Sequence, residues 1–243
     1  MLEYRRLARS RRKLLALTGL TRREFRTLFP AFVDAYRSRY EGNKTLAGRK
    51  RKRQVGGGRV GKLERAEQKL LFILVYTKAY PLQVVLGELF ELSQASTNEW
   101  LQRLLPVLRE ALQALGVMPE RTGADFARAE RRKHESAEYI IDGTERRRQR
   151  PKKPAKQALH YSGKKKTHSD KNVLIVHTRS KRVGYLSPTY AGKTHDKKVA
   201  DNEQIVYPRQ ASLHKDTGFQ GYEPRVKYSY QPKKAARLFP NYP

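Results

Sequence analysis

One short stretch constrains the fold of this chain more than any other. Residues Tyr139 to Ile141 are aromatic and apolar, and Asp142 and Gly143 follow them directly. This pattern predicts a short buried strand that carries one carboxylate to its carboxyl end. The next segment, residues 146–166, is rich in Lys and Arg and contains no Asp or Glu. A lone carboxylate before a cationic run is expected where a metal ion meets a polyphosphate, but an aspartate that only caps a turn would give the same local pattern.

The net charge indicates the kind of partner. The 243 residues include 53 Lys and Arg against 23 Asp and Glu, which gives a formal net charge of +30. Such a basic chain is typical of proteins that bind nucleic acid, and its phosphate contacts should weaken as salt rises. The absence of Cys excludes disulfides and thiolate zinc sites. No apolar run is long enough to cross a membrane, so we expect a cytoplasmic, nucleoid-associated protein without a membrane or small-molecule partner.

Residues 1–48 predict an N-terminal helical segment. Thr21 and Glu24 have the spacing of a capping box, and apolar residues then recur on one helical face. Because Pro30 interrupts this run, we expect either a kink or two short helices. Residues 49–62 combine consecutive cations with three glycines and predict a basic Gly-rich linker, which is either a solvated loop or an arm that follows phosphates.

Residues 63–116 predict a helix-turn-helix DNA-binding region. After a Leu-rich first helix, Pro81 opens a second, Ser93 caps a third, and Pro106 starts a fourth that stops before Gly116. In a helix-turn-helix the second of the two helices enters the DNA major groove, although a purely structural bundle would pack similarly. The outward side of the expected third helix carries side chains that can pair with base edges, namely Gln94, Asn98, Gln102 and Arg103.

The remaining residues predict a linker, 117–137, and a mixed α/β domain, 138–243. Two β-type runs at 172–177 and 182–186 could form a hairpin, and a loop then opens a helix toward Glu203. A weaker strand ends at Asp216. The predicted fold class is therefore α plus α/β, an all-helical part followed by a sheet with helices.

Asp142 and Asp216 are the candidate catalytic and metal-binding residues. Each follows an apolar strand, so the two carboxylates converge if those strands are neighbours. Carboxylate oxygens select Mg²⁺ or Mn²⁺, and two such ions can activate a nucleophile and stabilise the leaving oxygen of a phosphodiester. His195 beside Asp196 is the remaining pairing of interest, and a capping or positioning role suits it better than catalysis.

Four ordered blocks of this sequence resemble bacterial IS5-type DDE transposases, which use two Asp and one Glu. The blocks are Ile141-Asp142-Gly143-Thr144-Glu145-Arg146, Tyr161-Ser162-Gly163-Lys164-Lys165-Lys166-x-His168-x-x-Lys171-Asn172, Gly192-x-x-His195-Asp196 and Asp216-Thr217-Gly218-Phe219-Gln220-Gly221-Tyr222. The resemblance implies a partial RNase H-like nuclease domain in which Asp142 and Asp216 match the first two acids. It also implies Mg²⁺ or Mn²⁺ as cofactor, terminal inverted repeats and target DNA as substrates, and a homodimer.

The basic residues of these blocks are the expected contacts to DNA phosphates. They follow the first strand or lie in the second block, and they are Arg146, Arg147, Arg148, Lys164, Lys165, Lys166 and His168.

The sequence departs from this family after Asp216. The third acid of the family lies on a downstream helix within a Tyr-Arg-Glu-Lys pattern, whereas the acid that follows here is Glu223, set before Pro224. We expect a C-terminally truncated transposase with impaired cleavage. The alternative is an inactive DNA-binding remnant that competes with the full-length enzyme. An unrelated RNA-binding protein is disfavoured, because no aromatic RNA-recognition motif is present.

Overall fold

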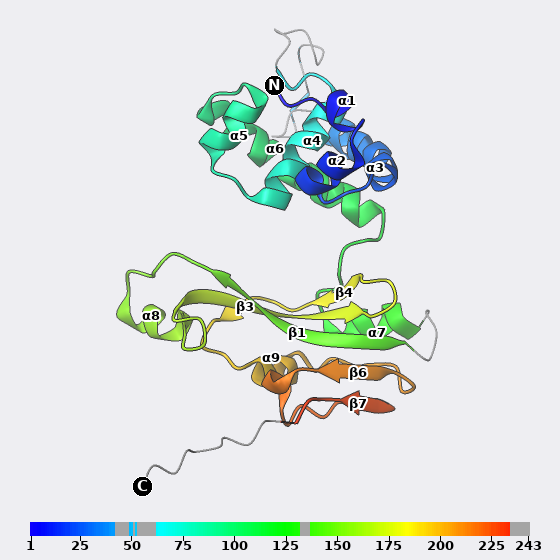
Figure 1. Cartoon of the computed structure of the whole chain (residues 1–243), viewed down its shortest axis with the longest axis vertical. Coiled ribbons are helices and arrows are strands. Elements are labelled where there is room, and N and C mark those ends of the chain that lie inside the picture. The colour runs from blue at the N-terminus through cyan, green and yellow to red at the C-terminus, as the bar shows by residue number, and fades with distance from the viewer. Residues whose placement is uncertain (42–48, 51, 53–61, 132–136, 234–243) are drawn as a thin grey trace. The chain divides into compact units, whose positions relative to one another are not determined.

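The structure is a computed structural model that describes residues 1–41, 49–50, 52, 62–131 and 137–233. The chain divides into two compact units, Met1–Val117 and Met118–Pro243, each with its own hydrophobic core. The first is helical and the second is built on a mixed sheet with helices, which confirms the predicted fold class (Figure 1). The basic linker predicted at 49–62 lies largely outside the described residues.

Helices alone form the regular structure described in the first unit. Side chains of Ser10, Thr21 and Ser93 cap three of them, and Thr21 with Glu24 forms the predicted capping box. The helices are α1 (Tyr4–Leu7), α2 (Arg11–Thr18), α3 (Arg22–Tyr40), α4 (Ala66–Ala79), α5 (Gln83–Phe90) and α6 (Gln94–Ala114).

Pro30, expected to interrupt a helix, and Pro106, expected to start one, both lie inside continuous helices. Pro30 lies within α3, and Pro106 lies within the 21-residue α6, so the fourth helix predicted to start at Pro106 does not exist. Proline removes one helical hydrogen bond, but packing of an apolar face supplies most helix stability in a protein. Here Leu104, Val107 and Leu108 are buried on either side of Pro106, and their packing stabilises α6 as one continuous helix.

The N-terminal helices and the helix-turn-helix region share one core. Phe25 and Phe32 of α3 are buried with Leu70 of α4 and Leu101 of α6. The N-terminal helical segment and the region 63–116 therefore pack as one unit, because the apolar face of α3 lies on the same helices.

A sheet in the order β2-β3-β1-β6-β7 forms the framework of the second unit, and β4 and β5 also pair with β3. Strand β1 pairs antiparallel with β3 and parallel with β6, and β6 pairs parallel with β7. The strands are β1 (Glu138–Arg147), β2 (Tyr161–Ser162), β3 (Thr167–His177), β4 (Val183–Leu186), β5 (Tyr190–Ala191), β6 (Ser212–Lys215) and β7 (Tyr228–Tyr230). The hairpin predicted for 172–186 is present as β3 and β4.

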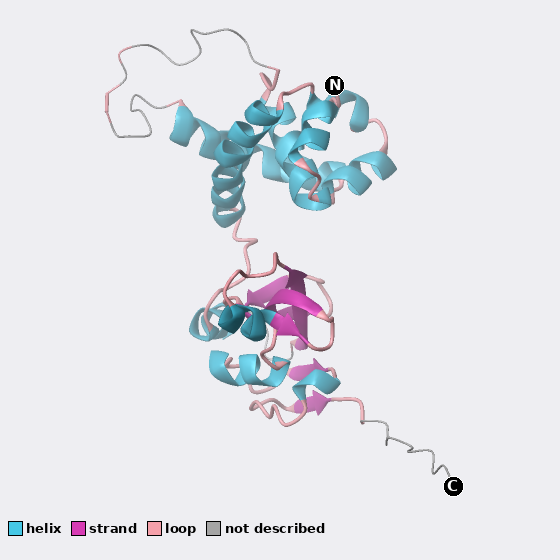
Figure 2. Ribbon diagram, turned by 90° about the vertical axis from the view of Figure 1, so that its left-hand side faces the viewer, coloured by secondary structure: helices cyan, strands magenta, loops and turns pink. Residues whose placement is uncertain are grey.

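The helices of this unit gather on one side of its sheet (Figure 2). They are α7 (Gly123–Arg131), α8 (Pro154–His160) and α9 (Asp196–Glu203), with a short 3₁₀ turn, η1, at Thr217–Phe219. Phe126 of α7 and Val199 of α9 are buried with Tyr139 and Ile141 of β1. On the other face of β1, Ile140 is 39% exposed.

The linker predicted at 117–137 contains helix α7, which is part of the second core. Phe126 is fully buried and contacts Tyr139, Tyr185 and Tyr207 edge-on. Glu130 at the other end of α7 accepts a hydrogen bond from the Tyr139 hydroxyl at 2.7 Å. In the described part of the chain, no helix is long and apolar enough to cross a membrane.

Candidate active site

Asp142 and Asp216 occupy equivalent positions on adjacent strands. Strands β1 and β6 run parallel, and the last paired residues in this register are Ile141 and Lys215. Asp142 is the next residue of β1, and Asp216 directly follows the end of β6, so each acid comes just after a pair of backbones about 4.8 Å apart. Seventy-four residues of sequence separate them (216 − 142), and strand pairing brings them together.

Each aspartate binds the loop that follows it and leaves carboxylate oxygen available. Asp142 Oδ1 accepts a hydrogen bond from the Gly143 amide at 2.8 Å, and Asp216 Oδ1 accepts one from the Gly218 amide at 2.9 Å. Both side chains are exposed. Two exposed carboxylates on one side of adjacent strands are donors that suit a hard divalent cation. Asp142 and Asp216 would hold it, and such an ion supplies Lewis-acid stabilisation of phosphate charge.

A third aspartate packs directly behind this pair. Asp196 begins α9, and its carboxylate lies against the glycines that follow the two acids. A Cβ atom placed on Gly143 would lie 2.5 Å from Asp196 Oδ1, and one on Gly218 would lie 2.8 Å from Asp196 Oδ2. A Cβ at either position would force the Asp196 carboxylate to move, so glycine is what allows this close packing.

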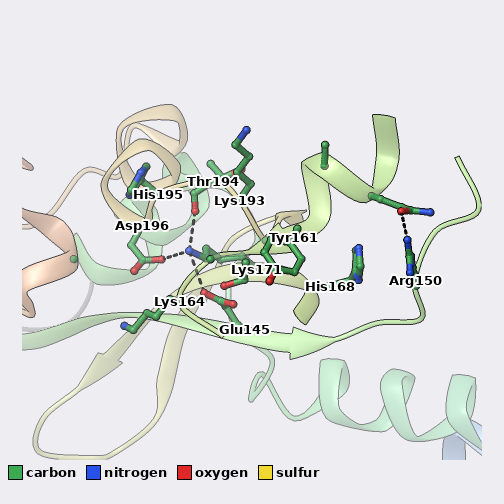
Figure 3. Close-up of a pocket in the computed structure, with 16 residues that line it drawn as sticks. Glu145, Arg150, Tyr161, Lys164, His168, Lys171, Lys193, Thr194, His195 and Asp196 are labelled. Atoms are coloured by element: carbon green, nitrogen blue, oxygen red, sulfur yellow. Dashed lines mark hydrogen bonds and ion pairs between the residues drawn. The ribbon is translucent and has the colours of Figure 1, made fainter. Parts of the chain in front are cut away.

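Lys171 on β3 joins Asp196 to Glu145 on β1 (Figure 3). Its Nζ lies 3.0 Å from Asp196 Oδ1 and 3.4 Å from Glu145 Oε1, and it donates a hydrogen bond to the Thr194 carbonyl at 2.7 Å. The Asp196 contact is a close ion pair without hydrogen-bond alignment. The Lys171 side chain is only 8% exposed, so its charge is compensated inside the protein.

Glu145 is held ionised within this group. Burial opposes its ionisation, but hydrogen bonds from Ser162 and Ser169 and the charge of Lys171 outweigh burial and lower the pKa of the Glu145 carboxyl. The Ser169 hydroxyl donates to Glu145 Oε2 at 3.0 Å. The buried ammonium group of Lys171 therefore lies between the carboxylates of Asp196 and Glu145.

A basic cavity of about 870 Å³ adjoins this group. Asp196, Glu145, Lys171 and Gly218 form part of its wall, whereas Asp142 and Asp216 do not line it. Five further side chains of basic type line it, namely Arg150, Lys164, His168, Lys193 and His195. Figure 3 shows Lys164 and Lys193 on different segments, on opposite sides of Lys171. A cavity of this size and charge can accept phosphate-bearing groups.

The basic residues predicted to bind DNA phosphates occupy different surroundings. Lys164 and His168 line the cavity. Lys165, Lys166 and Arg147 are exposed, and each lies within a few residues of a lining residue in the sequence. Two arginines are partly engaged within the protein. Arg146 donates to Asn172 Oδ1 at 2.9 Å, and Arg148 forms an ion pair with Asp170 at 2.8 Å.

The side chains predicted to read bases lie together on α6. Gln94, Asn98, Gln102 and Arg103 are all exposed, while Thr97, Leu101 and Leu104 of the same helix are buried. Asn98 Oδ1 accepts a hydrogen bond from Gln83 of α5 at 3.3 Å, so the two helices present polar groups side by side. On α5, Leu86 and Phe90 are buried, whereas Val85 and Leu89 are 49% and 39% exposed.

Sequence reasoning missed the residues that support the acid pair. Glu145 and Lys171 lie within the blocks that resemble the transposase family, but the sequence did not indicate that they support the acid pair. It also gave no sign that Lys193 and Arg150 belong to the site. Glu145 lies directly opposite Lys171 in the antiparallel pairing of β1 with β3. A prediction that these two strands pair would therefore have placed the two side chains together. In the described residues, no group of three or more His, Asp or Glu has the arrangement of a metal site.

The protein therefore combines a unit of packed helices with a sheet unit that carries two exposed aspartates after adjacent strands and a separate basic cavity. Residues 141–239 match the family described as DDE superfamily endonuclease, and residues 61–114 match the one described as helix-turn-helix of DDE superfamily endonuclease. These matches support a DDE-type transposase that binds and cleaves DNA, and endonucleases of this superfamily depend on divalent metal. Comparison with curated proteins and with solved structures found no significant match.

Proposed function

We propose that this protein is the transposase of an insertion sequence of the IS5 type, with an RNase H-like nuclease unit. The observation that supports the proposal is the parallel pairing of β1 with β6, whose last paired residues, Ile141 and Lys215, directly precede Asp142 and Asp216. The reaction is attack of water on a phosphodiester at an element end, which releases a 3′-OH. That 3′-OH then attacks a phosphodiester of target DNA and displaces a 3′-oxygen. Asp142 and Asp216 would hold Mg²⁺ or Mn²⁺, which would supply charge stabilisation at the phosphate.

Other side chains of the protein recognise the DNA and hold it in place. Gln94, Asn98, Gln102 and Arg103 read base edges of the terminal inverted repeats. Basic residues around the cavity, above all Lys164 and His168, contact phosphates of the donor strand and hold it near the acids. A homodimer would bring two element ends together, and binding to chromosomal DNA would place the protein on the nucleoid.

We propose further that cleavage by this polypeptide is slow. Its described residues offer no third carboxylate grouped with Asp142 and Asp216 in the arrangement of a metal site. Glu223, the next acid in sequence, is 73% exposed and pairs instead with Lys215 at 3.2 Å. This observation favours the alternative function, a DNA-binding protein that competes with an active transposase for the same ends.

Labelled inverted-repeat DNA tests both functions. The purified chain is incubated with it in Mg²⁺ or Mn²⁺, alongside Asp142→Asn and Asp216→Asn. Metal-dependent nicking that both variants lose supports the transposase, whereas a gel shift without nicking in any sample supports the competitor. Nicking that persists in both variants would refute the assignment of the acids.

A further inference from the structure

We propose that Lys171 is a positioning residue for the acid pair and acts on it through Asp196. The inference rests on the proposed function, because it takes Asp142 and Asp216 as the metal-binding residues. It concerns a side chain that touches neither acid in the contacts described, and it explains why a buried cation lies beside a site that must attract cations.

The first step is the position of Asp196. Its carboxylate touches the places where side chains of Gly143 and Gly218 would be, and these glycines donate the amides that bind Asp142 Oδ1 and Asp216 Oδ1. Asp196 therefore supports both loops that orient the acids. A shift of its carboxylate would move both loops, and with them both acids.

The second step is how Asp196 is held. It stands at the first residue of α9, and its N-cap residue, His195, makes no capping hydrogen bond with its side chain. Lys171 supplies the missing restraint, since its Nζ lies 3.0 Å from Asp196 Oδ1 and also binds the Thr194 carbonyl just before the helix.

The third step is the anchor of Lys171 itself. It lies opposite Glu145 in the β1–β3 pair, and Glu145 is in turn bound by the Ser169 hydroxyl. The sheet therefore fixes the ammonium group, the ammonium fixes Asp196, and Asp196 fixes the two glycine loops. Supporting contacts of this kind behind metal ligands typically change metal affinity by about 10–100-fold.

Positioning and simple charge make opposite predictions for loss of the lysine. Removing a positive charge near two carboxylates increases their attraction for a divalent cation, so charge alone predicts tighter Mn²⁺ binding. Loss of positioning predicts weaker binding, because the acids no longer converge. We expect Lys171→Met to weaken Mn²⁺ binding by the full-length protein about tenfold, measured by electron paramagnetic resonance without DNA.

Two comparisons assign the effect to the proposed connection. Lys171→Arg keeps the charge and should recover part of the affinity, and Lys171→Met combined with Asp196→Asn should be no weaker than Lys171→Met alone, because both act on one chain of contacts. Lys197→Met is the matched control on α9, since Lys197 forms an exposed pair with Asp201 and should leave Mn²⁺ affinity unchanged.

A measurement without metal completes the test. Hydrogen exchange of the amides at the start of α9 should speed up in Lys171→Met but not in Lys197→Met. Should Lys171→Met fail to fold, Lys171→Gln, which suits the same polar surroundings, replaces it. Unchanged or tighter Mn²⁺ binding in the folded variant, or unchanged exchange, overturns the role of Lys171. If Asp142→Asn and Asp216→Asn also leave Mn²⁺ binding intact, the proposed function fails instead.

Discussion

At the scale of single residues, glycines determine how closely the parts of the site approach. Gly143 and Gly218 leave room for the Asp196 carboxylate, and Gly87 of α5 leaves room for the Leu92 carbonyl in the turn before α6. Gly218 and Gly143 are visible in the sequence, where they indicate turns after the acids. What they admit was not predictable, because Asp196 reaches them only after α9 has packed on the sheet.

Gly143→Ala should weaken both the second unit and its metal site. The added Cβ would lie 2.5 Å from Asp196 Oδ1 and 2.7 Å from its Cγ, so the start of α9 must move. Overpacking of this kind costs about 1–3 kcal/mol, and Mn²⁺ affinity should fall with it. Thermal unfolding and Mn²⁺ titration measure the two effects. Gly163→Ala is the control for stability, because nothing lies within 4 Å of its added Cβ; equal stability of the two variants would contradict the expectation.

Glu24→Gln should destabilise the first unit in a pH-dependent way. Hydrogen bonds from the Thr21 backbone N–H and hydroxyl lower the pKa of the Glu24 carboxyl below its ordinary value of 4.5. A carboxyl with a depressed folded pKa stabilises the fold above its unfolded pKa, and this stability is lost as pH falls through the folded pKa. The difference in melting temperature from wild type should therefore be present at pH 7 and shrink below about pH 4.5. It should be small, since Glu24 is exposed; a difference that grows toward acid would refute the sign.

At the scale of elements, local signals predicted the starts of helices well and their continuity poorly. The Thr21 and Ser93 caps are where the sequence placed them, because a cap depends on three or four neighbouring residues. Pro106 misled the prediction, since buried neighbours of α6 compensate for its missing hydrogen bond. Strand β7 was not predicted at all, as a three-residue edge strand takes its conformation from β6 rather than from its own pattern.

Helix α7 shows the same dependence on tertiary contacts. Its segment is highly charged, and a single large apolar side chain, Phe126, anchors it among the tyrosines of the sheet. Polar contacts of Glu130 with Tyr139 and His177 hold its other end. Charge and weak periodicity therefore indicated a linker, although the segment completes a core.

Phe126→Ala should destabilise the second unit by about 3–5 kcal/mol, the usual cost of removing a fully buried Phe. A linker residue would cost almost nothing. Chemical denaturation monitored by circular dichroism should show the transition of the sheet unit shifted and that of the helical unit unchanged. Val117→Ala, an exposed residue just before the second unit, provides the comparison and should shift neither transition.

At the scale of the whole molecule, the informative features are the net charge and the order of the elements along the chain. The charge of +30 predicted nucleic acid before any fold was known. The sequence also predicted that Asp142 and Asp216 converge if their strands are neighbours, because both aspartates follow apolar strands. The basic cavity was not predictable, since its basic residues come from the segment after β1, the turn before β3, β3 itself and the loop before α9.

Binding to DNA should depend steeply on salt, and Lys164 should account for part of the slope. Each phosphate contact adds about one to the slope of log affinity against log salt, so Lys164→Gln should lower it by about 1. Lys181, exposed in the turn after the far end of β3, is the matched control, and Lys181→Gln should leave the slope unchanged. Equal slopes in the three proteins would show that the cavity does not contact phosphate.

The place of β1 in its sheet sets an order of events during protein synthesis. Both of its neighbours, β3 and β6, come later in the chain. The ribosome therefore releases the helical unit first, and that unit has its own core and can fold and engage DNA while translation continues. Asp216 follows β6, so under the proposed function a nascent polypeptide would hold DNA before the two acids proposed to bind the metal are both present.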